Sequence, residues 1–222
     1  MGRLMLWRLG RFLHWLCLFC ALLSGVILAV FASVWLYRLD IVVLKIPQLV
    51  HMTPQVILKN YRQMLSYVML PWVTTLHMSQ FPSSFNGTQH FTDVKRLVQW
   101  LYLIFLVTGG ISWQFIHWLR QRQQLWLAYR PLQVMIWIPV MVAGLMGLGF
   151  QNFFIQFHEL LFRNQDWLFD PRLDPIIVAL PEAYFMHCFL LGITLLLLLL
   201  GGGLWWSHHS LPYLHQKRSS LP

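Results

Sequence analysis

Residues Phe12 to Leu36 read FLHWLCLFCALLSGVILAVFASVWL and contain no Asp, Glu, Lys or Arg. A helix needs about 20 apolar residues to cross the hydrocarbon core of a bilayer. The stretch is therefore predicted to span a membrane. Its length, and the lack of a small-residue cleavage site at its end, favour a retained anchor over a removed signal peptide.

Three further charge-free stretches are long enough to span a bilayer, at residues 97–116, 132–150 and 184–206. The whole chain has 222 residues, of which 58% are hydrophobic and 10% charged. Soluble domains carry about 25% charged residues, so this chain lacks the polar surface of a soluble protein. We expect an all-α integral membrane protein with four transmembrane helices in a single membrane domain, residues 1–222.

The charged residues predict the orientation of these spans. Basic residues without any acidic neighbour precede the first span, separate the second from the third and follow the fourth: Arg3, Arg8, Arg11, Arg120, Arg122, Arg130, Lys217 and Arg218. All seven acidic residues lie in the two remaining loops, 37–96 and 151–183. The positive-inside rule places both termini in the cytoplasm and these two loops outside it.

Both outer loops contain amphipathic patterns. Thr53 and Pro54 are favourable residues for a helix start, and Ile57, Tyr61 and Leu65 then recur at helical spacing. In the second loop, apolar residues from Phe153 to Leu161 repeat in the same way. We expect the two extracytoplasmic loops to form an interfacial cap.

The outer loops also carry the candidates for chemistry. His90 and Asp93 share a helix face if this segment is helical, and a carboxylate can orient an imidazole and stabilise its charged form. The alternative is an interfacial histidine with a capping aspartate. His158 lies among aromatic residues, and its alternative is a packed, hydrogen-bonded histidine.

Charged pairs in the second loop have structural explanations as well. Glu159 and Arg163 have the spacing of a helical ion pair. Arg172, between Asp170 and Asp174, could bind an anionic headgroup, but an ion pair within the loop is the favoured explanation.

Several classes of function lack their motifs. There is no HExxH helix, no GxSxG turn and no phosphate-binding loop. Cys17 and Cys20 form a CxxC spacing inside an apolar span, without a second ligand pair. The basic residues lie beside apolar runs and form no nucleic-acid-binding patch. No metal, cofactor or nucleic acid is expected.

Motifs in both outer loops resemble those of the Lit family, the bacterial lipoprotein intramolecular transacylases. In the second loop they are Phe157-His158-Glu159, Trp167, Phe169-Asp170-Pro171, Asp174-Pro175-Ile176-Ile177 and Leu180-Pro181-Glu182. In the first loop they are Asn60-Tyr61, Tyr67, His90 and Asp93-Val94-Lys95. The four-span topology with two outward loops agrees, so the resemblance covers most of the chain.

The resemblance implies a defined reaction in the bacterial cell membrane. Its substrates are lipoproteins whose N-terminal cysteine carries a diacylglyceryl group, and the sn-2 acyl chain moves to the α-amine of that cysteine. It implies His90 and His158 as catalytic residues. Supporting roles are expected for Asn60, Tyr61, Arg62, Asp93, Lys95, Glu159, Trp167, Asp170, Arg172, Asp174 and Glu182.

An α-amine with a pKa of about 8 needs a base before it attacks an ester, and the leaving oxygen needs a proton. Two histidines supply both functions, but the sequence does not assign the roles. Direct aminolysis is expected, because the outer loops contain no cysteine and neither histidine motif has a serine beside it. The alternatives are a membrane-embedded lipid hydrolase and a non-catalytic membrane scaffold.

Overall fold

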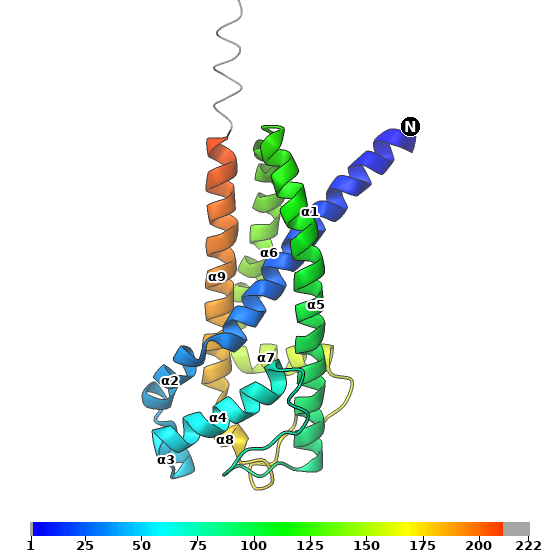
Figure 1. Ribbon diagram of the computed structural model, residues 1–222. Helices are drawn as coiled ribbons and strands as arrows, with labels where there is room; N and C mark the ends of the chain where they lie inside the picture. Colours follow the sequence, from blue (N-terminus) through cyan, green and yellow to red (C-terminus); the bar gives the residue numbers. More distant parts are fainter. Residues whose placement is uncertain (1, 211–222) are drawn as a thin grey trace, which may run out of the picture. The chain divides into compact units, whose positions relative to one another are not determined.

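The computed structural model describes residues 2–210, so Lys217 and Arg218 lie outside the described residues (Figure 1). All the regular elements in this range are helices, as expected. Long helices are α1 (Gly2–Ala32), α5 (Phe85–Gln121), α6 (Tyr129–Gly147) and α9 (Glu182–His209). Shorter ones are α2 (Val34–Val43), α3 (Ile46–Val50), α4 (Pro54–Met69), η1 (Leu125–Ala128), α7 (Phe150–Leu161) and α8 (Ile176–Ala179).

Within residues 2–210, four segments are long and apolar enough to cross a membrane: Arg8–Ala32, Phe85–Gln121, Leu125–Gly147 and Glu182–His209. Only 6–28% of their most apolar windows is buried inside the protein. The exposed remainder is apolar surface that lipid covers at less cost than water. This chain is therefore a membrane protein with four transmembrane helices.

The helix boundaries differ from the predicted spans where the backbone breaks. The first span was predicted to reach Leu36, but α1 ends at Ala32 and α2 starts after Ser33. The third was predicted to reach Phe150, but α6 ends at Gly147. Gly149 has a φ of 149°, which L side chains rarely adopt, and it allows the chain to start α7 in a new direction.

The second long helix begins well before the predicted position 97. The 37 residues of α5 make a helix about 55 Å long at 1.5 Å per residue, whereas the hydrocarbon core is about 30 Å thick. Part of α5 therefore extends beyond the hydrocarbon. Its first three turns contain His90, Asp93 and Lys95, the polar residues that would be costly to bury in lipid.

The chain divides into two compact units, and each long helix contributes to both. Unit 1 comprises residues 1–26, 103–144 and 192–222. Its helix segments approach closely at glycines: a Cβ on Gly25 would lie 2.8 Å from the Phe105 ring, and one on Gly203 would lie 3.2 Å from Leu132. Small residues at such contacts are typical of helices packed in a membrane.

Unit 2 comprises residues 27–102 and 145–191 and contains the hydrophobic core. Its amphipathic helix α4 starts at Pro54, as predicted, although the Thr53 side chain makes no capping hydrogen bond. The buried face of α4 places Tyr61 against Tyr37 of α2, with ring centroids 3.9 Å apart. The Tyr61 hydroxyl is 2.8 Å from that of Tyr184 at the start of α9.

Two polar contacts connect α2 to later parts of unit 2. The Tyr37 hydroxyl donates to the Ala179 carbonyl oxygen at 2.7 Å, and Nδ1 of His187 lies 2.8 Å from Oδ1 of Asp40. Asp40 is 3% exposed, and burial raises the pKa of its carboxyl group while the contact with His187 lowers it. His187 of α9 thus has a carboxylate partner on α2.

Candidate active site

Unit 2 brings His90 and His158 together, although they come from different helices and lie far apart in the chain. His90 lies on α5 and His158 on α7, with ring centroids 6.0 Å apart and ring planes at 37°. Hydrogen bonds in catalysis span about 2.6–3.2 Å between heavy atoms. Two imidazoles at this separation are close enough to contact one reacting centre.

The His158 imidazole has a defined orientation and tautomer. Its Nδ1 is 2.8 Å from the Phe154 carbonyl oxygen, one helical turn earlier. Because a carbonyl oxygen only accepts, Nδ1 carries the hydrogen and donates it. In the neutral ring, Nε2 then holds the lone pair that accepts a proton.

Burial lowers the pKa of His158, and the hydrogen bond to Phe154 opposes this shift only in part. Aromatic neighbours provide much of the burial: the ring centroids of Phe154 and Trp167 lie 4.1 and 5.0 Å from that of His158. Desolvation disfavours the charged imidazolium. His158 is therefore held in its neutral, proton-accepting form.

His90 is 9% exposed and surrounded by aromatic rings. Its ring centroid is 4.8 Å from that of Phe162 and 5.5 Å from that of Phe169, both with near-perpendicular edge contacts. Its buried Nδ1 has no hydrogen-bond partner among the described residues. Such unpaired buried polar groups are uncommon and occur at catalytic sites.

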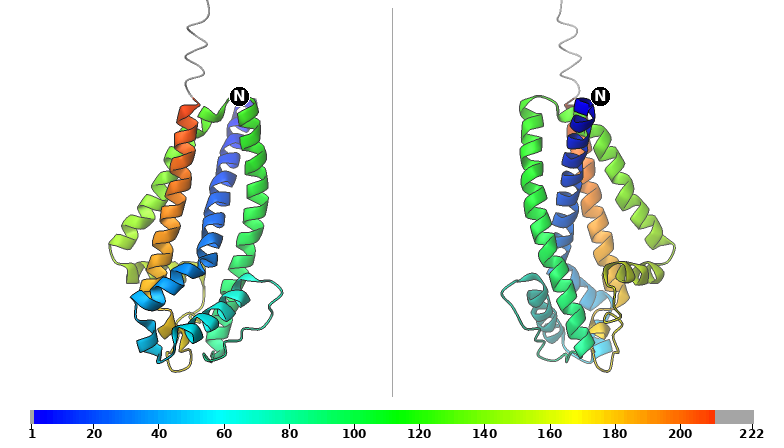
Figure 2. Two further views of the ribbon diagram at one scale, coloured as in Figure 1. Left: turned by 60° about the vertical axis from the view of Figure 1, so that its left-hand side comes forward. Right: turned by 90° about the vertical axis from the view of Figure 1, so that its right-hand side faces the viewer.

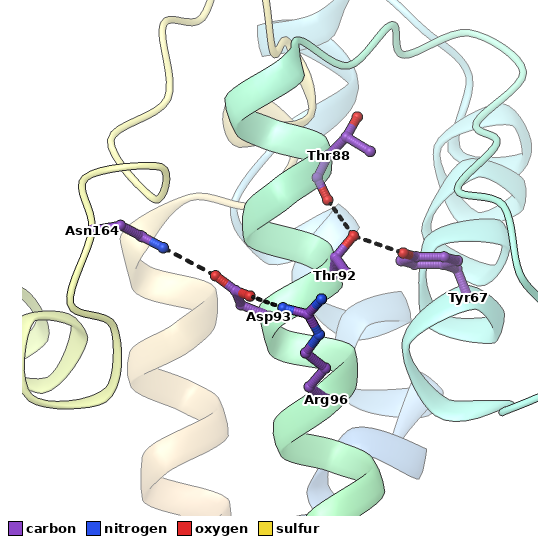
Figure 3. A network of polar contacts seen from close by, with 6 residues as sticks. All are labelled: Tyr67, Thr88, Thr92, Asp93, Arg96 and Asn164. Atoms are coloured by element: carbon purple, nitrogen blue, oxygen red, sulfur yellow. Dashed lines mark hydrogen bonds and ion pairs between the residues drawn. The ribbon is translucent and has the colours of Figure 1, made fainter.

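The segment after α7 is attached to the first turns of α5 on both sides of His90. The Asn164 side-chain amide donates to Oδ2 of Asp93 at 3.0 Å, and Nη1 of Arg96 donates to Oδ1 at the same distance (Figure 3). Asp93, for which orientation of His90 was one of two roles considered, makes no hydrogen bond with it within the described residues. Its carboxylate instead connects α5 to the second loop.

Asp174 makes the second of these attachments. It is 3% exposed, and its carboxylate accepts from the Ser84 backbone N–H at 2.7 Å and from the Ser84 hydroxyl at 2.6 Å. A Cβ on Gly87 would lie 2.1 Å from Oδ1 of Asp174, so only glycine fits there. The start of α5 is thereby fixed against the second loop.

Helix α4 and the loop after it hold α5 from another direction. The Thr92 hydroxyl donates to the Thr88 carbonyl oxygen at 2.8 Å and therefore accepts from the Tyr67 hydroxyl at 2.9 Å (Figure 3). The Lys95 ammonium donates to the backbone carbonyl oxygens of Leu70 and Val73 and lies 4.6 Å from the Tyr67 ring centroid. His90 is thus carried by a helix segment with little freedom to move.

Other predicted residues lie farther from the two imidazoles. Asn60 is fully buried and binds Gln80 through both its amide oxygen and its amide nitrogen. Tyr61 belongs to the tyrosine cluster with Tyr37 and Tyr184. These residues stabilise the first loop without contact to His90 or His158 in the described interactions.

The charged residues predicted to support the site are mostly at the surface. Arg172 forms the expected intra-loop ion pair, with Nη2 2.7 Å from Oδ2 of Asp170, and this contact lowers the Asp170 pKa to about 2. Arg62, Glu159 and Glu182 are exposed. The structure describes no ion pair of Glu159 with Arg163, because α7 ends at Leu161, before Arg163 completes the helical spacing.

Sequence reasoning missed several residues around the two imidazoles. Phe162, Asn164, Ser84 and Thr92 all contact the site or the helix that carries it. Their only signal in the sequence is closeness to the histidine motifs. A serine or an asparagine in a turn-rich loop is otherwise expected to form local turn contacts.

Comparisons with known proteins give one consistent result. The sequence model of the family described as "Lipoprotein intramolecular transacylase Lit" matches residues 12–185. The solved structure of the membrane-integral lipoprotein intramolecular transacylase Lit from Bacillus cereus is 28% identical, with a TM-score of 0.84 and complete coverage of both chains. No curated protein sequence matches the chain.

Two further solved structures are variants of the same Bacillus cereus protein with one histidine replaced. The arginine variant has a TM-score of 0.74 and 28% identity, covering 100% of both chains. The alanine variant has a TM-score of 0.80 and 26% identity, covering 99% of this chain and 100% of that one.

Proposed function

Because the chain belongs to the Lit family of lipoprotein intramolecular transacylases, we propose that its acyl transfer takes place at the paired imidazoles of His90 and His158. The chain is a bacterial membrane acyltransferase. In this family the sn-2 acyl chain of an S-diacylglyceryl cysteine moves to the α-amine of the same cysteine, which leaves a lyso lipoprotein. The 6.0 Å separation of the two rings is the observation that carries the proposal.

His158 is the general base. Its Nδ1 hydrogen is committed to the Phe154 carbonyl oxygen, so Nε2 is the nitrogen that accepts a proton from the attacking amine. Its lowered pKa keeps it neutral at pH values where an exposed histidine is partly charged. These two features support His158 over His90 as the base.

His90 stabilises the oxygen side of the reaction. As the amine nitrogen bonds to the ester carbonyl carbon, negative charge develops on the carbonyl oxygen, and a ring N–H of His90 donates to it. The bond from that carbon to the sn-2 oxygen then breaks. The leaving oxygen takes the proton that His158 removed from the amine, so no proton is gained or lost overall.

The aromatic surroundings favour transfer to the amine over transfer to water. Phe162, Phe169 and Trp167 pack around the two imidazoles and lower the local polarity. An apolar site of this kind accommodates acyl chains and limits the entry of water. A hydrolase needs a bound water as nucleophile, whereas the transacylase already holds its nucleophile in the same molecule as the ester.

The orientation proposed for the protein places unit 2, with its histidine pair, on the extracytoplasmic side. All seven acidic residues belong to unit 2, and unit 1 contains none. The excess of arginine in unit 1 is typical of cytoplasmic segments. Diacylglyceryl lipoproteins in the outer leaflet would then reach the site from the membrane.

The test is mass spectrometry of the N-terminal peptide of one lipoprotein, in cells that lack other N-acylating enzymes. The diacylglyceryl substrate peptide and its N-acyl product have equal mass. Fragmentation spectra must therefore show which atoms carry the acyl chains. We expect the intact protein to convert the diacylglyceryl form into the N-acyl form. His90→Ala and His158→Ala should each lower conversion by about 100-fold or more, the usual contribution of an oxyanion donor and of a general base.

His77→Ala is the matched control, because His77 is exposed in unit 2 and contacts neither imidazole in the described interactions. Full conversion by a His90→Ala or His158→Ala variant would overturn the proposal that acyl transfer takes place at these two imidazoles. Release of free fatty acid in place of N-acylation would support the hydrolase. An acyl chain found on the enzyme itself would contradict direct aminolysis.

A further inference from the structure

Unit 1 contains a cavity that the reaction at the histidine pair does not use. It has a volume of about 970 Å³ and lies between α1 and the segment formed by η1 and α6. Three arginines line it: Arg8 and Arg11 from α1, and Arg130 from α6. From these residues we propose that the cavity is a binding site for one anionic phospholipid, distinct from the site of the lipoprotein substrate.

The charge balance of unit 1 supports an anionic ligand. Its three segments contain eight basic residues and neither aspartate nor glutamate. The three arginines at the cavity therefore belong to a unit with a large excess of positive charge. A phosphodiester is a suitable partner, because arginine binds phosphate oxygens through two parallel hydrogen bonds.

The remaining lining is suited to acyl chains. On α1, Phe12, Leu16 and Phe19 continue the helical stripe that starts with Arg8 and Arg11. From Arg8 to Phe19 this stripe is about 16 Å long at 1.5 Å per residue. Phe12 is 62% exposed, so the stripe is open to a chain lying along it.

The α6 side of the cavity has the same order of charge and apolar surface. Arg130 is followed at helical spacing by Val134 and Ile138, which also line the cavity. α1 and α6 run in the same direction from the end of the unit that holds the chain's N-terminus (Figure 2). The arginines thus lie at one end of the cavity, and the apolar lining residues extend away from that end.

Aromatic residues at the charged end indicate the depth of this site in the membrane. Trp126 and Tyr129 line the cavity next to Arg130. Tryptophan and tyrosine favour the headgroup region, where one side of the ring is apolar and the other is hydrated. Arginines at this level meet lipid phosphates, and basic pockets between transmembrane helices bind anionic headgroups.

The experiment uses the purified full-length protein and native mass spectrometry in detergent. Phosphatidylglycerol, phosphatidylethanolamine with the same chains and glycerol 3-phosphate are each added. We expect retained phosphatidylglycerol and much weaker retention of the zwitterionic lipid. Arg11→Gln/Arg130→Gln should reduce phosphatidylglycerol binding roughly tenfold to thirtyfold, the loss expected for two arginine–phosphate contacts.

Arg120→Gln/Arg122→Gln is the matched control, since it removes the same charge from exposed residues that do not line this cavity. An equal loss in both double variants would overturn the site, as would equal binding of the two lipids. Binding of glycerol 3-phosphate as strong as that of the lipid would show a phosphate site without a lipid. No lipoprotein is present, so the result is independent of the histidine pair.

Size-exclusion elution and the unfolding temperature show whether each variant is folded. If the double variant unfolds, the single variants Arg11→Gln and Arg130→Gln are compared with Arg120→Gln. Each should then lose roughly fourfold in phosphatidylglycerol binding. Unchanged binding in both folded single variants would contradict the proposal.

Discussion

The burial of His158 determines how its imidazole responds to pH. Neighbouring aromatic rings lower its pKa below the ordinary value of 6.5. The neutral base form therefore persists to lower pH than in an exposed histidine, and it is lost only as the pH falls through the lowered pKa. We expect the ¹⁵N resonances of this ring to titrate with a midpoint below 6.5.

Comparison of spectra with those of a His158→Gln variant assigns the signal. Trp167→Ala removes a ring whose centroid lies 5.0 Å from that of His158 and should raise the midpoint toward 6.5. Leu168→Ala, at an exposed neighbouring position, should leave it unchanged. A midpoint at or above 6.5 in the unmodified protein would show that His158 is hydrated and unsuited to the role of a desolvated base.

Gly87 is the residue at which a single methyl group should have the largest effect. The Cβ of Gly87→Ala would overlap the Asp174 carboxylate and displace it from Ser84. We expect a loss of about 1–3 kcal/mol in the free energy of unfolding. N-acylation should also slow, because the start of the helix that carries His90 is no longer fixed. Thermal unfolding and a transacylation assay measure the two effects.

Gly110→Ala is the control on the same helix, because a Cβ there has no neighbour within 4 Å. It should leave stability unchanged or raise it slightly through the higher helix propensity of alanine. Similar behaviour of the two variants would mean that the contact between Gly87 and Asp174 does not constrain the site.

At the scale of helices and loops, one contact has a testable consequence. Asn164, in the segment that follows α7, binds Asp93 of α5. Asn164→Ala removes the hydrogen bond between the two elements, whereas Arg96→Ala removes only an exposed ion pair within α5. Exposed ion pairs contribute about 0–1 kcal/mol. We expect Asn164→Ala to lower the transacylation rate several-fold and Arg96→Ala to change it by less than about twofold.

Both variants should remain folded, with unfolding temperatures close to that of the unmodified protein. The comparison is informative because the two substitutions affect the same carboxylate. An equal loss of activity would indicate that Asp93 acts through its charge and not as a connection between α5 and the second loop.

The sequence predicted the long elements better than their ends. Charge-free stretches of 19 or more residues have few structural options in a membrane, so the four spans were found from hydropathy alone. The break at Ser33 and the early start of α5 were missed, because apolar composition alone does not show where a helix stops. The amphipathic helices α4 and α7 were predicted from their periodicity.

The site was predictable in its residues but not in its geometry. The histidine motifs identified His90 and His158, but they did not show that the two imidazoles lie side by side. Contacts such as Asn164 with Asp93 and Asp40 with His187 join residues far apart in the chain, and no local pattern marks them. Orientation of His90 was one of two roles considered for Asp93, and the contacts of its carboxylate with Arg96 and Asn164 were not predicted.

For the molecule as a whole, the distribution of charge predicts the orientation in the membrane. In a chain without Cys17, Cys20 and Cys188, single cysteines are placed at exposed positions, as Gln121→Cys in unit 1 or Gln165→Cys in unit 2. A membrane-impermeant maleimide added to intact spheroplasts should label only the second. Labelling of the first should require permeabilised membranes.

The cysteine-free chain without a new cysteine gives the background signal, and transacylation in cells shows that each variant is folded. Labelling of Gln121→Cys from outside, with Gln165→Cys protected, would reverse the orientation. It would also place the histidine pair in the cytoplasm.

The contact between Asp40 and His187 has a consequence for synthesis. A ribosome completes α2 early, whereas α9 is the last of the described helices to leave it and enter the membrane. Until then, the Asp40 carboxylate lacks the imidazole that it binds in the finished protein, and Tyr61 lacks Tyr184. These two contacts of unit 2 can therefore form only after α9 is made, although a nascent chain stalled before α9 already carries both histidines of the site.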